Sequence, residues 1–231
     1  MSERIIKPII TEDGSHTLYI PEMDEHYHSV HGAVQESNHV FLDAGFRAKE
    51  QDEYKILEIG FGTGLNALLT FIESQKQSKP VYYTTLELYP LSKEITDQLN
   101  YPRMLNLPEA EAIGYRQILD APWSKHEGEF TQIAANFFVR KLYVDFTKFD
   151  FADKYNLIYF DAFAPDKQPE MWDSSLFDRI SQATDAGGIL TTYCAKGVVR
   201  RALIASGFNV ERLPGPPGKR EMLRGTKNND D

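Results

Sequence analysis

Cysteine is almost absent from this chain of 231 residues, and long apolar runs are missing altogether. The single Cys194 excludes an internal disulfide framework and fits a reducing cytoplasm. The histidines 26, 28 and 31 lack the cysteine or carboxylate spacing of zinc sites, so we predict no metal. No apolar run approaches the roughly 20 residues of a bilayer-spanning helix, and residues 1–4 lack the apolar core of a secretion signal. We therefore expect a cytoplasmic protein with no membrane partner.

Basic residues are outnumbered by acidic ones, 25 to 34, which gives a net charge of −9. Eight of the basic residues nevertheless lie close together near the end of the sequence. A local basic face on an acidic protein can hold a polyanion while the acidic remainder limits non-specific binding. An ordinary solvated helix and strand would show the same composition. Between residues 196 and 227, only Glu211 and Glu221 oppose eight basic residues, which are Lys196, Arg200, Arg201, Arg212, Lys219, Arg220, Arg224 and Lys227.

The hydrophobic content of 42% suffices for one sizeable α/β domain. We predict an N-terminal extension (1–50) with a hairpin turning at Asp13-Gly14 and a helix from Val34 to about Lys49. A main domain (51–227) and a polar tail (228–231) follow. Strands then alternate with helices, which predicts a doubly wound, mostly parallel seven-stranded sheet. Strands are expected near 54–60, 81–88, 137–145, 155–161, 188–194, 208–214 and 219–226, and helices near 65–76, 90–99, 174–184 and 196–206. Residues 101–136, broken by prolines, stay unassigned.

The turn after the first strand of this domain carries three alternate glycines, Gly60, Gly62 and Gly64, preceded by Glu58. Such a strand-to-helix turn lets a ligand approach the backbone closely and offers it the free N–H groups of a helix N-terminus. A dinucleotide fingerprint would need its third glycine at Leu65, and a phosphate-binding loop would need Gly-Lys-Ser/Thr. The pattern therefore favours neither of those two sites.

Glu87 ends the next predicted strand, roughly 20 residues beyond the glycines, where an acidic side chain can hold ribose hydroxyls. For Glu87 alone, a solvated charge at a strand end is the alternative. Together with the glycine turn, Glu87 resembles the S-adenosyl-L-methionine site of class I methyltransferases. The resemblance implies the class I S-adenosyl-L-methionine-dependent methyltransferase fold and a nucleoside cofactor without a pyrophosphate.

A further strand end, Asp161 to Pro165, carries candidate chemistry in the sequence Asp-Ala-Phe-Ala-Pro. Ligands lie at the carboxyl ends of parallel strands, so Asp161 should share a crevice with the glycine turn. A loop stiffened by Pro165 can hold an amine in line with a methyl donor. A primary ammonium must first lose a proton, and Asp161 is the nearest plausible acceptor. A helix N-cap or a surface turn is the alternative for Asp161.

The segment from Asp161 to Trp172, Asp-Ala-Phe-Ala-Pro-Asp-Lys-Gln-Pro-Glu-Met-Trp, resembles the signature of the MnmC methyltransferase family. Further segments agree in order, and the likeness spans about residues 15–226. Members of the family make 5-methylaminomethyl-2-thiouridine at the tRNA wobble position, in some bacteria fused to a flavin-dependent oxidase. Because this sequence stops at Asp231 without a second glycine fingerprint, the resemblance implies the stand-alone form. That form would act on 5-aminomethyl-(2-thio)uridine in the anticodon loop, after other enzymes install the aminomethyl group.

The resemblance also implies a role for each matching position. For S-adenosyl-L-methionine, the pocket residues would be Glu58, Gly60, Gly62, Gly64, Asn66, Glu87, Asp145 and Asp161. Within this set, Glu58 would orient the methionine ammonium, and Asp145 would bind the adenine amino group or, alternatively, cap a helix. Transfer itself would depend on Asp161, Phe163 and Pro165.

On the substrate side, the resemblance implies an aromatic enclosure, a lid and a phosphate-binding face. Phe163 and Trp172 would enclose the unstacked uridine, with a place in the core as the alternative. Tyr27, His28 and Glu36 would close the site. The remaining RNA-facing positions would be Lys167, Arg200, Arg201, Lys219 and Arg220, of which the last four are candidates for phosphate contact.

Two other functions stay open from the sequence. An aminopropyltransferase-like enzyme of the same fold would use a related nucleoside to alkylate a polyamine, and it would not need the basic residues near the chain end. A non-catalytic RNA-binding module would keep a vestigial cofactor pocket. The intact glycines and carboxylates argue against such decay, and cofactor binding without turnover would support it.

Overall fold

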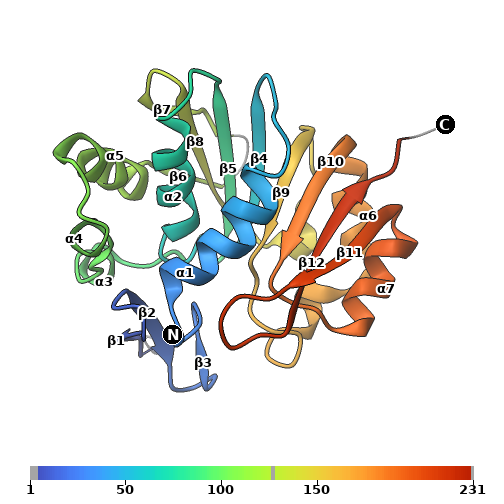
Figure 1. Ribbon diagram of the computed structural model, residues 1–231, viewed down its shortest axis with the longest axis horizontal. Helices are drawn as coiled ribbons and strands as arrows, with labels where there is room; N and C mark the ends of the chain where they lie inside the picture. The colour runs from blue at the N-terminus through green and yellow to red at the C-terminus, as the bar shows by residue number, and fades with distance from the viewer. Residues whose placement is uncertain (1–4, 126–127, 230–231) are drawn as a thin grey trace.

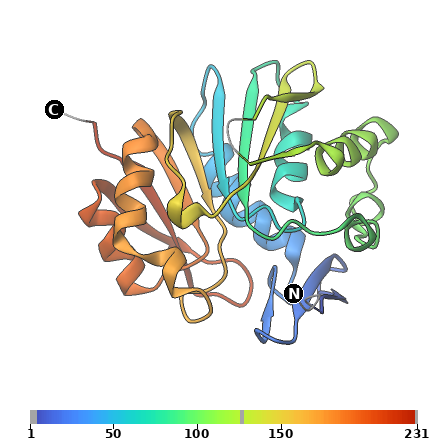
Figure 2. The ribbon, with the colours of Figure 1, turned by 180° about the vertical axis from the view of Figure 1, so that it is seen from behind.

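A twisted nine-stranded sheet organises the computed structural model, which describes residues 5–125 and 128–229 (Figure 1, Figure 2). Eight strands form one path in the order β11-β12-β10-β9-β4-β5-β8-β6, and β7 pairs with β8. The bounds are β4 Tyr54–Ile59, β5 Val81–Glu87, β6 Trp123–Ser124, β7 Thr131–Ala134, β8 Phe137–Tyr143, β9 Tyr155–Phe160, β10 Thr184–Thr192, β11 Phe208–Pro214 and β12 Glu221–Lys227.

All seven predicted strands are present, and β4, β5, β8, β9 and β10 run parallel. β12 lies antiparallel between β10 and β11. Because β4 pairs with β9 on one side and with β5 on the other, the order of the strands reverses there, and ligands bind at such a point in open α/β sheets. The predicted doubly wound, mostly parallel architecture is confirmed, and β6 and β7 extend its edge.

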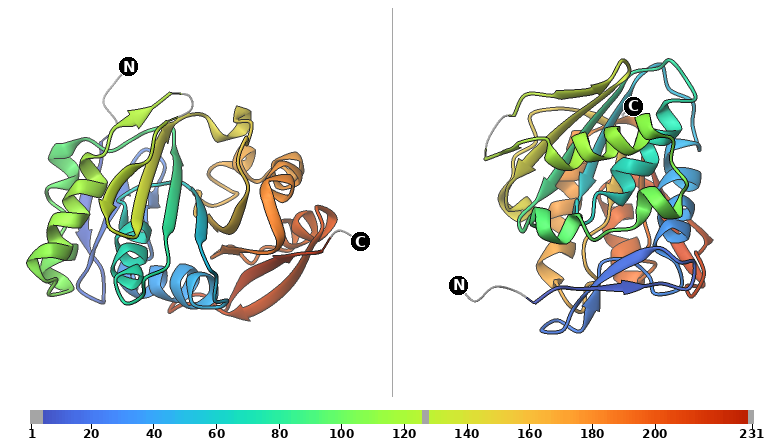
Figure 3. Two further views of the ribbon diagram at one scale, coloured as in Figure 1. Left: turned by 90° about the horizontal axis from the view of Figure 1, so that it is seen from above. Right: turned by 90° about the vertical axis from the view of Figure 1, so that its left-hand side faces the viewer.

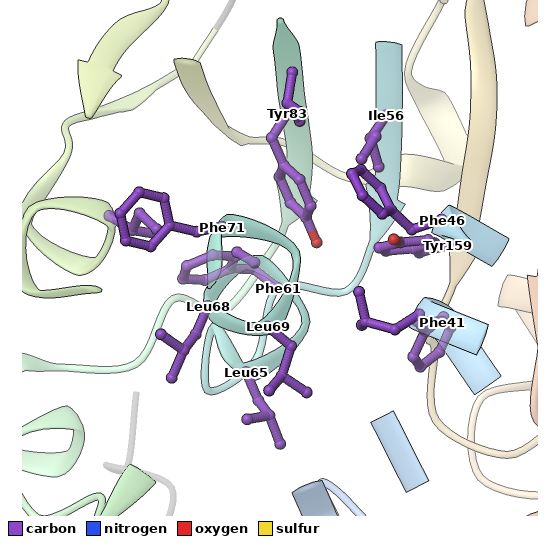
Figure 4. Close-up of a cluster of buried hydrophobic side chains, with 14 of the residues drawn as sticks. Phe41, Phe46, Ile56, Phe61, Leu65, Leu68, Leu69, Phe71, Tyr83 and Tyr159 are labelled. Carbon is purple, nitrogen blue, oxygen red and sulfur yellow. The ribbon is translucent and has the colours of Figure 1, made fainter. Parts of the chain in front are cut away.

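Alternate side chains of β4 enter two separate hydrophobic cores, as expected for a central strand. Ile56 belongs to the core that includes residues of α2 (Leu65–Ser74) and α5 (Glu109–Asp120). Leu57 and Ile59 belong to the core that includes residues of α6 (Ser174–Ala183) and α7 (Gly197–Ala205). Figure 4 shows the first core, with Tyr83 pointing from the sheet toward α2. Helices therefore cover both faces, which leaves the strand ends to form the site.

The N-terminal residues form a three-stranded sheet of their own, β1 (Lys7–Ile10), β2 (His16–Ile20) and β3 (Glu25–His26). This small sheet lies at the lower edge of the molecule in Figure 1 and is seen from the side in Figure 3. The predicted hairpin is present, and Gly14 has a φ of 84° in its turn. The following helix comprises α1 (Ala33–Ser37) and a π-helical run (Asn38–Phe46), so it ends before the predicted Lys49.

One predicted helix is much shorter than expected. The segment 90–99 contains only α3 (Lys93–Thr96), because extended Ser92 starts the helix after Pro90. The unassigned segment 101–136 contains α4 (Tyr101–Met104) and α5 in addition to β6 and β7, and two 3₁₀ turns, η2 (Phe146–Lys148) and η3 (Pro169–Trp172), follow β8 and β9. Among the helices of the described residues, none has the length and apolar character that crossing a membrane requires. The end of the predicted tail, residues 230–231, lies outside the described residues.

Candidate active site

A cavity of about 610 Å³ lies at the carboxyl ends of β4, β5, β8 and β9, a size that suits a small-molecule ligand. The N-terminal segment supplies the opposite wall with residues 25–31. The sequence-predicted residues that line this cavity are Tyr27, His28, Glu36, Gly60, Gly62, Glu87, Asp145, Asp161, Phe163 and Lys219.

The conformations of two glycines explain how the walls approach one another. Gly60 has a φ of 90°, and a Cβ there would lie 2.6 Å from the Asp161 carbonyl oxygen. Gly62 has a φ of 50°, and a Cβ there would lie 2.9 Å from the Tyr27 ring. Both the backbone conformation and the available space therefore require glycine. The turn is the place where the ends of β4 and β9 and the N-terminal segment meet.

Glu87 is fixed at the end of β5 by two backbone donors. The N–H of Gly62 donates to its Oε2 at 3.1 Å, and the N–H of Tyr89 donates to its Oε1 at 2.9 Å. Each carboxylate oxygen can accept a second hydrogen bond, so Glu87 remains able to accept from hydroxyl groups in the cavity. Beside it the wall is apolar, formed by Leu88, Val144 and Phe146.

Asp145 lines the same wall, but its carboxylate is engaged within the protein. Oδ1 accepts hydrogen bonds from Thr147 N at 3.0 Å and Thr147 Oγ1 at 2.6 Å, and Oδ2 pairs with Lys148 Nζ at 2.9 Å. The hydrogen bonds from Thr147 lower the pKa of Asp145, with the Lys148 contacts adding to them and partial burial opposing them. The alternative drawn from the sequence, a helix N-cap, is thus the role that the structure shows, at the 3₁₀ turn η2.

Asp161 is held by a buried amide that also holds a second acid. Asn66 Nδ2 donates to Asp161 Oδ2 at 2.8 Å and to Glu58 Oε1 at 3.1 Å. Glu58 is fully buried beneath the turn and does not line the cavity. The strand directs this side chain into the interior, and its expected contact with a methionine ammonium stays a prediction. Burial raises the pKa of Glu58 well above its usual range, which favours the protonated form.

The environment of Asp161 suits proton exchange near neutrality. Burial raises the pKa of Asp161 to about 7, and the negative charge of Glu36 adds to the rise. The hydrogen bond from Asn66 and the positive charge of Lys219 act in the opposite direction. A carboxylate with such a pKa can accept a proton from an ammonium group and release it to water at physiological pH.

The loop that follows Asp161 is tied down by two side chains. Tyr193 Oη donates to the Ala162 carbonyl at 2.8 Å, and Trp172 Nε1 donates to the Phe163 carbonyl at 2.8 Å. The Trp172 side chain is buried against Phe160, with ring centres 4.8 Å apart, and does not line the cavity. The prediction that Trp172 encloses a base is therefore wrong, and its alternative, a place in the core, is correct. Phe163 does line the cavity.

The N-terminal wall packs directly on the glycine turn. Tyr27 meets Phe163 edge to face, with ring centres 5.2 Å apart. His28 Nε2 lies 2.8 Å from Thr63 Oγ1, and burial lowers the pKa of His28 to about 4, so the ring is neutral at pH 7. His31 Nδ1 lies 3.0 Å from Glu12 Oε1. Across residues 5–125 and 128–229, no three His, Cys, Asp or Glu side chains are arranged to hold a metal ion.

Lys219 was expected on a phosphate-binding face, but it lies inside the cavity. Its Nζ pairs with Glu36 Oε1 at 2.5 Å and lies 4.1 Å from the centre of the Tyr193 ring. The Glu36 side chain is 8% exposed and that of Lys219 34% exposed, so solvent screens the pair weakly. The turn before β12 directs the side chain toward Glu36 of α1, and the phosphate contact expected of Lys219 stays a prediction.

The remaining predicted residues lie outside the cavity lining. Gly64 is the N-cap of α2, and Pro165 belongs to the loop after β9. Lys167 Nζ donates to the Met23 carbonyl at 2.7 Å. The basic residues Arg200 and Arg201 lie on α7, and Arg220 has an 89% exposed side chain beside Glu221.

Sequence reasoning missed Tyr193 and the apolar wall. Tyr193 follows β10 directly, so the rule that ligands lie at the carboxyl ends of parallel strands would have selected it. The same rule would have selected Val144, which follows β8. Sequence motifs identify neither residue, because an isolated tyrosine or valine carries no motif of its own.

Comparison with known proteins adds a family to this geometry. Residues 110–228 match the model of a family described as S-adenosyl-L-methionine-dependent methyltransferase. A relative from Cupriavidus metallidurans, the tRNA 5-methylaminomethyl-2-thiouridine biosynthesis bifunctional protein MnmC, is 31% identical over 226 residues. That alignment covers 94% of this chain and 33% of the relative, so the chain spans about one third of the relative's length.

Two solved structures share the fold. The crystal structure of MNMC2 from Aquifex aeolicus has a TM-score of 0.76 at 24% identity, covering 100% of this chain and 74% of that one. Spermidine synthase from Thermotoga maritima has a TM-score of 0.56 at 11% identity, covering 99% and 74%. At these identities the two likenesses support the architecture and carry no argument about substrates.

Proposed function

We propose that this chain, which belongs to the S-adenosyl-L-methionine-dependent methyltransferase family, methylates a primary amine in tRNA. The acceptor would be the aminomethyl nitrogen of 5-aminomethyl-(2-thio)uridine at the wobble position. The observation that carries the proposal is the partly exposed Asp161 in the cavity wall, whose pKa of about 7 equips it to take a proton from an ammonium group. The name of the Cupriavidus relative, which specifies 5-methylaminomethyl-2-thiouridine biosynthesis, supports the choice of substrate.

The cavity fits the cofactor of the family at two points. The Glu87 carboxylate keeps accepting capacity for ribose hydroxyls. Leu88, Val144 and Phe146 offer an apolar wall for an adenine ring. When bound, S-adenosyl-L-methionine supplies a methyl group on a positively charged sulfur.

The residues of the chain would do the remaining work on the amine. Asp161 would take one proton from the substrate ammonium and leave a nitrogen lone pair. The hydrogen bonds that tie the carbonyls of Ala162 and Phe163 to Tyr193 and Trp172 fix the loop, so the nitrogen is held in one orientation. Tyr27 and Phe163 would exclude water above the reacting nitrogen, since their rings pack together at the cavity wall.

The exposed basic residues would bind the tRNA backbone. Arg201 on α7 and Arg220 before β12 are exposed, and Arg200 is partly exposed on the same helix. Arginine contacts to phosphate position an RNA without reading its sequence. Enzymes that install the aminomethyl group would have to act first, which implies a functional link to them and a place in the cytoplasm with the tRNA.

The direct test is to mix the purified chain with methyl-labelled S-adenosyl-L-methionine and tRNA that bears 5-aminomethyluridine. After digestion, mass spectrometry should find the label on 5-methylaminomethyluridine, and the Asp161→Asn variant should yield roughly 10²-fold less product. Spermidine and putrescine, offered in place of tRNA, should stay unlabelled. Cofactor binding with unlabelled nucleosides would contradict the proposed substrate.

The tRNA face has a separate test. Charge reversal by Arg200→Glu with Arg201→Glu should weaken tRNA binding and reduce its salt dependence. A matched control is Lys55→Glu with Lys79→Glu, because these lysines lie at or just before the amino ends of β4 and β5, opposite the cavity. Equal losses in both double variants would remove α7 from the proposed RNA face.

A further inference from the structure

The Glu36–Lys219 ion pair joins the two ends of the chain inside the cavity. Lys219 Nζ lies 2.5 Å from Glu36 Oε1, and the N–H of Ser29 donates to Glu36 Oε2 at 2.7 Å. The same ammonium lies 4.1 Å from the centre of the Tyr193 ring, within cation–π distance. Both oxygens of the carboxylate and the cation are therefore held in place by the protein.

This pair is also connected to the loop that bears Asp161. Tyr193, whose ring faces the ammonium, donates its hydroxyl to the carbonyl of Ala162, the residue after Asp161. Glu36, Asp161 and Lys219 all line the cavity. Because all three are buried or only partly exposed, their charges act on one another with little screening.

We propose that Lys219, by pairing with Glu36, offsets negative charge beside the amine site, so that Asp161 loses its proton more readily than it would beside an unpaired Glu36. The inference rests on the proposed function, because it concerns how the same site accepts its amine. Glu36 and Lys219 are positioning residues in this proposal, and Asp161 remains the group that meets the substrate.

The other groups around Asp161 do not supply the compensating charge. Burial raises the pKa of Glu58 from β4 and so favours its neutral form, and Asn66 from α2 is an amide. Tyr193 after β10 and Tyr83 from β5 have pKa values raised by burial and by nearby carboxylates, so both are neutral. Among the described residues that face Asp161, the charges that remain are those of Glu36 and Lys219.

The pairing resolves a conflict between binding and deprotonating an ammonium. Two unpaired carboxylates would attract the cation, but each would make the other harder to ionise. Lys219 offsets part of the charge of Glu36, so Asp161 experiences less than the full repulsion of a second carboxylate. Asp161 can then both attract the ammonium and take its proton.

Two opposite substitutions test the proposal through the titration of Asp161. In protein labelled with ¹³C at aspartate carboxyls, the Asp161 signal, assigned by its loss in Asp161→Asn, should titrate near pH 7. Lys219→Met should move this midpoint upward by about one pH unit, and Glu36→Gln should move it downward by a similar amount. The double variant should return to within about half a unit of the unsubstituted protein. No substrate is needed for this measurement.

Two control variants separate charge from shape. Lys219→Arg keeps the charge and should keep the midpoint. Lys76→Met removes a charge from a side chain that is 63% exposed and should also leave the midpoint unchanged. Glu36→Gln changes volume little, so it tests the proposal even where Lys219→Met fails to fold.

The pH dependence of methyl transfer gives the second readout. Its acid limb should move with the Asp161 midpoint in each variant, upward for Lys219→Met and downward for Glu36→Gln. Midpoints that stay fixed, or that move in the same direction in both single variants, would overturn the proposal. Midpoints that move as expected in a protein that leaves tRNA amines unmethylated would refute the proposed function and retain the charge coupling.

Discussion

Replacing Asp161 by asparagine should make the protein more stable and much less active. Burial raises the pKa of Asp161 from 3.8 to about 7, so the folded state favours the protonated carboxyl. The stabilisation that results is fully present below pH 3.8 and is lost as the pH rises through about 7. Asparagine is nearly isosteric, stays neutral, and still accepts the hydrogen bond from Asn66.

The size of the effect follows from the two pKa values. At about 1.4 kcal/mol per pKa unit, keeping this carboxylate ionised at pH 8 costs about 4 kcal/mol of folding free energy. At pH 5, where the folded state keeps its proton, the cost falls to about 2 kcal/mol. Asp161→Asn should therefore gain stability over the unsubstituted protein, and the gain should be about two to three times as large at pH 8 as at pH 5.

Urea unfolding at the two pH values measures this difference, and calorimetric titration with S-adenosyl-L-methionine checks that the cofactor still binds. Asp150→Asn is a suitable control, because its side chain is 99% exposed and the change should alter stability little at either pH. A destabilisation by Asp161→Asn of equal size at pH 5 and pH 8 would refute the claim that burial raises this pKa. Undiminished methyl transfer in the same variant would remove Asp161 as the proton acceptor.

Three further predictions concern the walls of the cavity. Burial lowers the pKa of His28 to about 4, so the stability that the neutral ring gives above pH 6.5 should be lost as the pH falls through 4. The free energy of unfolding of the unsubstituted protein should therefore fall between pH 7 and pH 4, and in His28→Gln this fall should be smaller by up to about 3 kcal/mol. Gly62→Ala should weaken cofactor binding at least about tenfold in calorimetry, because its Cβ would press on Tyr27 from a left-handed backbone. Trp172→Phe should cost about 1–3 kcal/mol in urea unfolding and lower turnover more than cofactor affinity, since it frees the Phe163 carbonyl.

The parts of the site that the sequence predicted correctly are the ones that local rules control. Gly60, Glu87 and Asp161 each follow or end an apolar strand, and parallel strands bring their carboxyl ends to one edge. Neighbours along the chain were enough to locate them. The seven strands were found for the same reason, because strand periodicity is a local signal.

The sequence left a choice open where a side chain had two destinations that neighbouring residues do not distinguish. Trp172 was equally compatible with a cavity wall and a core, and the packing of η3 against Phe160 decided for the core. Glu58 belongs to the glycine motif, yet the alternation of β4 turns its side chain away from the cavity. Asp145 is the N-cap of η2, where it accepts a hydrogen bond from the N–H of Thr147, two residues later. This contact, like the glycine turn, depends only on neighbours along the chain.

Lys219 shows a different limit, because its environment is formed by the opposite end of the chain. The sequence groups Lys219 with Arg220 and other basic residues as candidates for contact with RNA phosphates, and an exposed lysine beside Arg220 would suit that role. The sheet instead places the turn before β12 against the N-terminal segment. Lys219 therefore pairs with the buried Glu36, which lies 183 residues away along the chain. A lysine that would bind RNA on the surface can instead, when it lies in the cavity, lower the pKa of Asp161. Charge counted along a sequence therefore predicts a partner only for residues that the fold leaves on the surface.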